Sequence, residues 1–224
     1  MPALRPVPIR ILASRIIADA HPDLLPGLLP PGVAPFVGRH ASLALFTADC
    51  DDVGYIAVDE ATKQAKVEVL YASSFYAGAA NASMPYAGEF IGALAGPTPS
   101  DAAAGLAAAI GCYEHEAAFH YADEAESVIF LDHTVAACGT YFSREAGIPV
   151  GSPLAYLIAP PLEATLGLDA ALKAADVALV KHFPPPTPTN FSGAWLTGSL
   201  GDCRAACAAF REAVLDVVAR PRED

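Results

Sequence analysis

The sequence predicts an α+β fold in which one structural unit occurs twice along the chain. Two observations predict this fold: an internal repeat, and the same order of apolar strands and alanine-rich helices in each copy. "DEATKQAKVEVLY" begins at Asp59 and "DAALKAADVALVK" begins at Asp169, a displacement of 110 residues, and Asp, Ala, Lys, Ala and Val coincide between them. We expect the first repeat over residues 1–111 and the second over residues 112–224.

Each repeat is expected to contain the same elements in the same order. An apolar strand ("SLALFTA", "LAYLIAP") precedes a short helix ("VDEATKQA", "LDAALKAA"), and a β-branched strand follows ("KVEVLYA", "DVALVKH"). A long loop then leads to another apolar strand ("EFIGALAG", "AWLTGSL") and to a closing amphipathic helix. The closing helices, "PSDAAAGLAAAI" and "CRAACAAFREAV", align at a displacement of 104 residues, and Ser100 is the expected N-cap of the first.

The composition indicates a protein with large apolar interfaces. Hydrophobic residues make up 54% of the 224 residues and charged residues 17%, against about 25% charged in an ordinary soluble domain. The stretch "RILASRIIADAHPDLLPGLLPPG" is broken by Arg15, Asp19 and prolines, so it is not expected to span a membrane. Because Arg10 and Arg15 also interrupt any export signal, we expect a cytosolic protein that buries surface against other subunits.

The charge and the missing motifs exclude several classes of function. The net charge is −12 and no basic run is present, so neither nucleic acid nor an anionic membrane is an expected partner. No nucleophile motif, phosphate-binding glycine loop or zinc signature occurs in the sequence. We therefore expect no catalytic residue and no cofactor.

Two groups of residues have to be weighed as metal ligands. Cys203 and Cys207 lie four residues apart in a predicted helix, but no nearby His or Cys pair completes a set of four ligands. Packing of two small apolar side chains is the preferred interpretation. His115 and His120 lie in "CYEHEAAFHYADE", whose candidate ligands do not share one helical face. The sequence therefore predicts no metal site.

The stretch "ADCDDVGY" places three carboxylates within four residues, at Asp49, Asp51 and Asp52. It lacks the spaced oxygens and the final glutamate of a calcium loop. Asp49 is interpreted as the end of a strand. For Asp51 and Asp52, solvated turn residues are one alternative. The other is a function specific to the first repeat, because the matching turn of the second repeat is the apolar "APPLEAT".

Several of these strings resemble the L-type shell proteins of ethanolamine-utilisation bacterial microcompartments, the EutL type. The resemblance is strongest in "ADCDDVGYIAVDEATKQAKVEVLYASSFYAGAA", "IAPPLEATLGLDAALKAADV" and "PPPTPTNFSGAWLTGS", and it runs from about residue 44 to about residue 218. It implies an α+β tandem repeat of two circularly permuted bacterial-microcompartment (BMC) domains. It also implies a flat homotrimer, pseudohexameric in outline, that tiles with other shell proteins and is not an enzyme.

The resemblance further implies a small-pore site for ethanolamine, formed by Asp51, Asp52, Glu89, Phe119 and Thr189. The chemistry suits such a ligand. Carboxylates bind an ammonium group by charge-assisted hydrogen bonds, an aromatic face adds cation–π attraction, and a hydroxyl oxygen suits the alcohol end.

The long loops 73–88 and 183–193 are expected to gate a central pore, as the resemblance implies. Loops of this length within a compact repeat usually have a function. Two other classes of function are weaker alternatives: a soluble small-amine sensor that does not assemble, and an enzyme.

Overall fold

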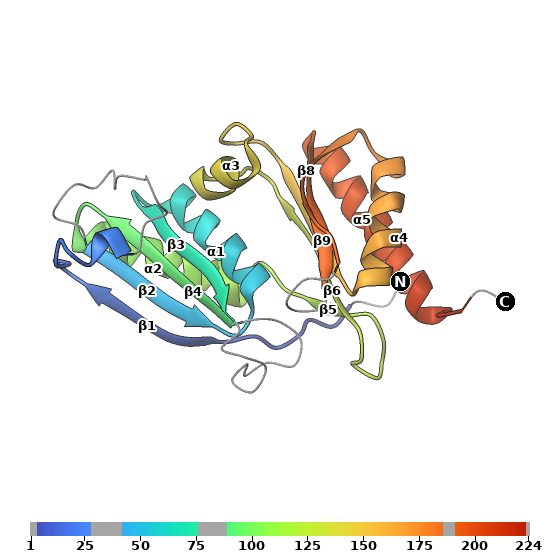
Figure 1. The fold of residues 1–224 in the computed structure, drawn as a ribbon, viewed down its shortest axis with the longest axis horizontal. Coiled ribbons are helices and arrows are strands. Elements are labelled where there is room, and N and C mark those ends of the chain that lie inside the picture. Colours follow the sequence, from blue (N-terminus) through green and yellow to red (C-terminus); the bar gives the residue numbers. More distant parts are fainter. Residues whose placement is uncertain (1–3, 28–41, 76–88, 186–190, 223–224) are drawn as a thin grey trace. The chain divides into compact units, whose positions relative to one another are not determined.

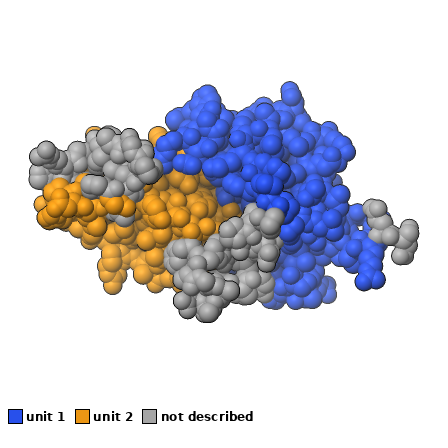
Figure 2. Space-filling view, in the orientation of Figure 1, with its two compact units in different colours: residues 1–8, 118–138, 143–224 blue, residues 9–117, 139–142 orange. Residues whose placement is uncertain are grey.

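A computed structural model of the chain describes residues 4–27, 42–75, 89–185 and 191–222 (Figure 1). The predicted α+β composition is confirmed, since antiparallel sheets alternate with helices along these residues. Two compact units are present (Figure 2): unit 2 contains Ile9–Ala117 with Gly139–Phe142, and unit 1 contains the rest of the chain. The division between two repeats at residue 111 stays a prediction, and helix α2, Pro99–His115, runs through that position.

Unit 2 is built on a four-stranded antiparallel sheet with the order β1-β2-β4-β3. Its strands are β1 (Ile11–Ile17), β2 (Ser42–Ala48), β3 (Glu68–Phe75) and β4 (Glu89–Gly96). Helices α1 (Asp51–Gln64) and α2 pack against each other on this sheet (Figure 1). A short 3-10 turn, η1 (Leu25–Gly27), buries Leu25 in a separate apolar cluster with Leu43 and Leu70.

Unit 1 is built on a five-stranded sheet with the order β5-β6-β7-β9-β8. Its strands are β5 (His120–Tyr121), β6 (Ile129–Val135), β7 (Leu154–Ala159), β8 (Val177–Phe183) and β9 (Ser192–Gly198). Helices α4 (Pro161–Ala174) and α5 (Leu200–Ala219) cover one face of the sheet and close the core of the unit (Figure 1). Between β6 and β7 lies α3 (Thr140–Ala146), whose first residues belong to unit 2.

The internal repeat is confirmed by the structure. The order β1-β2-β4-β3 in unit 2 matches β6-β7-β9-β8 in unit 1. Helix α1 begins at residue 51 and ends at 64, and α4 begins at 161 and ends at 174, so both ends are displaced by 110 residues. The strand after each helix carries a register shift at the same displacement, between Val69 and Tyr71 in β3 and between Leu179 and Lys181 in β8.

The predicted alignment of the closing helices was wrong. Helix α2 is capped by Thr98, whose side chain accepts from the N–H of Asp101, and α5 is capped in the same way by Ser199 and Asp202. These caps are displaced by 101 residues, not 104. Alanine-rich helices match one another in several registers about one turn apart, which explains the error. Ser100 is not the N-cap, because Pro99 lacks an N–H and suits the first helical turn.

Helices α1 and α4 begin earlier than the sequence predicted. The first turn of α1 contains Asp51 and Asp52, whose negative charges are favourable at a helix N-terminus. Helix α4 begins at Pro161, whose fixed φ angle is suited to the first helical position. Strands β1, β5 and β6 and helix α3 were not predicted from the sequence. In the part of the chain that the structure describes, no helix combines the length and apolar character needed to cross a membrane.

Candidate functional site

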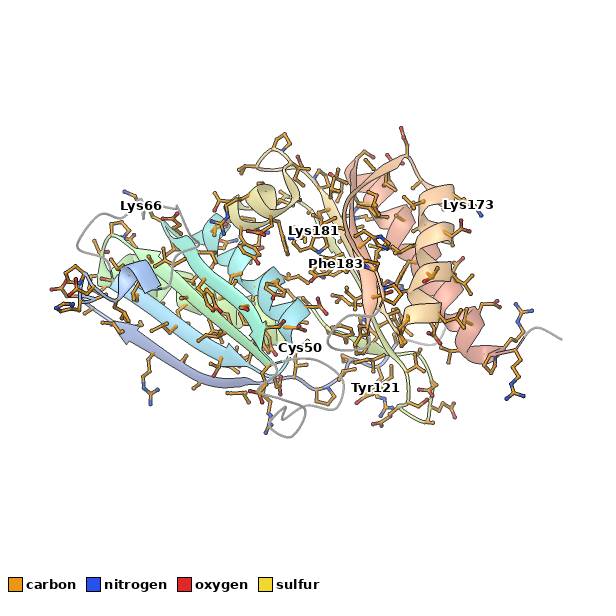
Figure 3. The ribbon with its side chains drawn as sticks, viewed as in Figure 1. Cys50, Lys66, Tyr121, Lys173, Lys181 and Phe183 are labelled. Atoms are coloured by element: carbon orange, nitrogen blue, oxygen red, sulfur yellow. The ribbon has the colours of Figure 1, made fainter. Side chains whose placement is uncertain are left out.

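The predicted acidic pair begins helix α1. Asp51 is buried and Asp52 is partly buried, and the Asp51 carboxylate accepts a hydrogen bond of 2.9 Å from the N–H of Asp52. The residue before them, Cys50, occupies the N-cap position but makes no side-chain capping bond (Figure 3). The positive end of the helix dipole therefore stabilises two carboxylates that would otherwise repel each other. Asp51 is therefore not a solvated turn residue, whereas Asp52 remains partly exposed to solvent.

Glu89 lies at the same end of the unit 2 sheet as the acidic pair. It is the first residue of β4 and pairs with Phe75 of β3. The next residue of β4, Phe90, pairs with Ala48, the last residue of β2. Since α1 begins three residues after Ala48, the register brings Glu89 to the end of the sheet where the acidic pair stands. Three predicted site residues are thus gathered in one unit.

Tyr55 also belongs to this end of unit 2, although it is not among the site residues predicted from the sequence. Its hydroxyl accepts a hydrogen bond of 2.9 Å from the N–H of Ser74, and its ring stands edge-on to Phe90 at 5.2 Å between centroids. Burial raises the pKa of Tyr55, and the nearby charges of Asp51 and Asp52 raise it further. Helical spacing could have identified Tyr55 as a site residue, because it lies one turn after Asp51 and therefore on the same side of the helix.

Asp49 does follow a strand, as predicted, but it is more than a strand end. Its side chain is buried and accepts hydrogen bonds from the Arg10 N–H at 2.7 Å and from the Tyr113 hydroxyl at 2.9 Å. It thereby links the residue that precedes strand β1, and helix α2, to the end of β2. Burial raises the pKa of Tyr113 above its usual range, so the phenol remains a donor. Asp49 is a structural residue of unit 2.

The remaining predicted site residues do not belong to unit 2. Phe119 belongs to unit 1, where it is buried and meets Phe191 edge-on at 5.9 Å between ring centroids. Its carbonyl accepts a hydrogen bond of 2.8 Å from Val7. Thr189 lies outside the described residues. The structure therefore places Asp51, Asp52 and Glu89 at one end of unit 2 and Phe119 in unit 1.

The cysteines and histidines considered as metal ligands have other surroundings. Cys203 and Cys207 are buried on the core side of α5, as predicted, and burial raises the pKa of Cys207 to about 12. His115 is exposed at the end of α2. The Nδ1 atom of His120 lies 3.9 Å from the carboxylate of Asp132. Within the described ranges, no three His, Cys, Asp or Glu side chains are grouped so that they could hold a metal ion.

The similarity of the fold to solved structures identifies the general class of protein to which this chain belongs. No protein-family model matches the chain. The fold is that of bacterial microcompartment shell proteins: a crystal structure of the trimeric shell protein PduB has a TM-score of 0.71 at 17% identity, covering 94% of this chain and 89% of that one.

Closer relatives define the family. The shell protein EutL of Salmonella typhimurium is 51% identical over 222 residues, covering 99% of this chain and 98% of that protein. EutL of Clostridium perfringens is 50% identical, covering 94% of both chains. The crystal structure of EutL from Leptotrichia buccalis has a TM-score of 0.89 at 50% identity and covers 99% of both chains. The chain belongs to the EutL family of bacterial microcompartment shell proteins, so it is a structural protein of a shell and not an enzyme.

Proposed function

We propose that this shell protein forms homotrimeric tiles in the shell of an ethanolamine-utilisation microcompartment, beside other shell proteins. We further propose that Asp51, Asp52 and Glu89, which we call the acidic group, bind the ammonium end of ethanolamine. One observation carries this second proposal: the acidic group occurs in one repeat alone. The displacement of 110 residues assigns Pro161 and Leu162 to the positions of Asp51 and Asp52. Applied to the pairing of β3 with β4 and of β8 with β9, it assigns Phe191 to the position of Glu89.

The chemistry of the acidic group supports an ammonium ligand. Each hydrogen bond between an ammonium and a carboxylate contributes about 1.5–3 kcal/mol net. The α1 dipole alone would offset part of the repulsion between the carboxylates, and a bound cation would offset the rest. The aromatic ring of Tyr55 adds a nearby apolar surface. In this proposal Phe119 supplies a further aromatic face and Thr189 supplies an oxygen to the alcohol end.

The proposed trimer is supported by composition and by the fold. A chain with 54% hydrophobic residues buries much of its outer surface in an assembly. Light scattering at micromolar concentration should give about three times 23.1 kDa. A small-amine sensor that does not assemble would stay at the mass of one chain. Loops 73–88 and 183–193 are proposed to gate a central pore of the trimer, and most of their residues lie outside the described part of the chain.

Calorimetry tests the proposed ligand. Ethanolamine should bind the parent protein, and Asp51→Asn, which keeps the shape of the side chain and removes one charge, should weaken binding at least about tenfold, or about 1.4 kcal/mol. Glu163→Gln is the matched control, because Glu163 is the acidic residue in the first turn of α4. It should leave the affinity unchanged.

A neutral ligand separates charge from shape in the same experiment. Ethylene glycol replaces the ammonium of ethanolamine by a hydroxyl, so it should not bind measurably to either protein. Equal affinities of the parent and Asp51→Asn for ethanolamine would contradict the acidic site and would leave the shell role of the family untouched.

A further inference from the structure

Tyr55 of helix α1 contacts both members of one residue pair in the sheet of unit 2. Ser74 of β3 and Phe90 of β4 lie opposite each other in the register of these strands. The Tyr55 hydroxyl accepts its hydrogen bond from the N–H of Ser74, and the Tyr55 ring stands edge-on to the ring of Phe90. The next pair of the same two strands contains Glu89. Tyr55 therefore connects the helix that begins with Asp51 to the strand that begins with Glu89.

Helix α1 approaches the Phe90 ring closely at the residue before Tyr55. A Cβ atom at Gly54 would lie 2.4 Å from the Cγ atom of Phe90. Any larger side chain at this position would therefore push the helix away from β4. Phe90 is fully buried, so its ring cannot move aside into solvent. Gly54 and Tyr55 together hold the start of α1 close to the start of β4.

A segment from the second half of the chain also contacts the Tyr55 ring. Tyr141 lies nearly parallel to Tyr55, with 6.2 Å between the ring centroids and 4° between the ring planes. It belongs to the segment Gly139–Phe142, which is part of unit 2. The first and last N–H groups of this segment donate to the buried carboxylate of Asp59 on α1, at 2.8 and 2.9 Å. The Tyr55 ring is thus held by two strands and by a segment that is itself fixed to α1.

The second repeat replaces Tyr55 and both of its partners in the sheet. The residues that match Tyr55, Ser74 and Phe90 are Thr165, Pro184 and Ser192. Pro184 has no N–H to donate, and neither Thr165 nor Ser192 has a ring. The Thr165 hydroxyl instead donates to the carbonyl of Pro161 in its own helix. The contacts of Tyr55 therefore occur in the repeat that carries the acidic group and cannot form in the repeat that lacks it.

We propose that Tyr55 is a positioning residue of the acidic group. By fixing the first turn of α1 to the ends of β3 and β4, it sets the distance from the carboxylates of Asp51 and Asp52 to that of Glu89. Charge-assisted hydrogen bonds need N···O distances of about 2.7–2.9 Å, so one ammonium can bind both parts of the group only at a fixed separation. This inference rests on the proposed ethanolamine site and names the residue that holds its two parts together.

The contacts of Tyr55 also oppose the repulsion within the acidic group. Without a bound cation the carboxylates on α1 and on β4 repel each other. The hydrogen bond to the hydroxyl of Tyr55 and the packing of its ring resist their separation. Because burial raises the pKa of Tyr55, its phenol stays uncharged and adds no further negative charge.

Calorimetry with ethanolamine on two matched variants tests this role. Tyr55→Phe keeps the ring and removes the acceptor of the Ser74 N–H, so the affinity should fall at least about fivefold. Tyr113→Phe is the control, because the Tyr113 hydroxyl is buried in the same unit but donates to Asp49, outside the acidic group. It should lower the urea midpoint by at least as much as Tyr55→Phe does and leave the affinity unchanged.

A double-mutant cycle tests whether Tyr55 acts through the acidic group. Glu89→Ala removes the carboxylate on β4, so no separation between two parts of the group remains to be set. Adding Tyr55→Phe to Glu89→Ala should therefore weaken the remaining affinity by less than about twofold. A loss of stability alone would not distinguish the two backgrounds.

The outcomes separate this inference from the proposed function. If the parent and Tyr55→Phe bind ethanolamine equally well, the positioning role is overturned and the acidic site stands. Equal weakening by Tyr55→Phe in the parent and in Glu89→Ala would also overturn it, and so would equal weakening by Tyr55→Phe and Tyr113→Phe. A parent protein that binds no ethanolamine would overturn both the proposed site and the role of Tyr55.

Discussion

Helices α1 and α4 have the same place in their repeats and the same length, but different surfaces. Their core sides match position by position: the buried residues of α4 all have buried counterparts in α1, namely Gly54, Ala57, Val58 and Ala61 against Ala164, Gly167, Leu168 and Ala171. Their outer sides and first turns do not match. The comparison teaches that packing on the sheet determines one side of the helix, while the other side is free to acquire a separate task in each repeat.

The first turns differ in charge. Helix α1 begins with Asp51 and Asp52, whereas α4 begins with Pro161 and Leu162. Both sequences start a helix well, because carboxylates complement the dipole and proline fits the first position. Helix formation therefore does not require the acidic pair, and its presence in one repeat needs another explanation. The proposed ethanolamine site provides that explanation.

The largest effect is expected at the two matching aspartates. Asp59→Ala leaves the buried N–H groups of Gly139 and Phe142 without their acceptor, so unfolding should become easier by about 3 kcal/mol. Asp169→Ala removes an exposed side chain and should change the stability of the monomer by less than about 0.5 kcal/mol. Urea denaturation, monitored by circular dichroism, measures both. Equal losses would show that the two helices are not covered differently.

A glycine substitution sharpens the same comparison. A Cβ atom at Gly139 would lie 2.1 Å from the Thr62 hydroxyl oxygen and 2.6 Å from the Asp59 carbonyl oxygen. Gly139→Ala should therefore displace the segment from α1 and destabilise the chain by about 2 kcal/mol. Gly111→Ala is the control, since Gly111 lies within helix α2 and a Cβ there meets nothing within 4 Å. It should be neutral or stabilising by up to about 1 kcal/mol.

A smaller effect on stability is expected at His120, which lies in the additional strand of the unit 1 sheet. Strand β5 forms a fifth strand in unit 1, and its His120 is held near Asp132 and Arg211. Burial, followed by the charge of Arg211, lowers the pKa of His120 below its usual value near 6.5.

The unfolded chain therefore binds a proton at a higher pH than the folded chain does. The stability from this residue is complete above about pH 6.5 and declines as the pH falls toward the lowered pKa. His120→Asn should reduce this decline, measured as urea midpoints between pH 7.5 and 5. An unchanged pH profile would contradict this account of His120.

Local patterns predicted much of this fold, and non-local contacts explain what was missed. The repeat, the strands β2, β3, β4, β7, β8 and β9 and their helices follow from apolar periodicity within short windows. The residues of strand β1 are visible in the sequence only as part of an interrupted apolar stretch, because the pairing of β1 with β2 cannot be seen within its own residues. The buried bond between Asp49 and Tyr113 likewise depends on how α2 packs.

Part of the candidate site could also be predicted from the sequence. Asp51 and Asp52 were found from their charge and from the apolar turn that replaces them in the second repeat. Tyr55 could have been added from helical spacing alone. The docking of Gly139–Phe142 on Asp59 could not, since it joins residues 80 apart in the chain through backbone donors that no side-chain pattern reveals.

The most direct test of the central claim is a crystal structure of the trimer with ethanolamine bound. The account predicts one ligand per chain, with its ammonium within hydrogen-bonding distance of the Asp51, Asp52 and Glu89 carboxylates. It predicts no ligand at the matching positions of the second repeat, Pro161, Leu162 and Phe191. Ethanolamine bound equally at both repeats, or away from the acidic group, would contradict the claim that the first repeat alone carries the site.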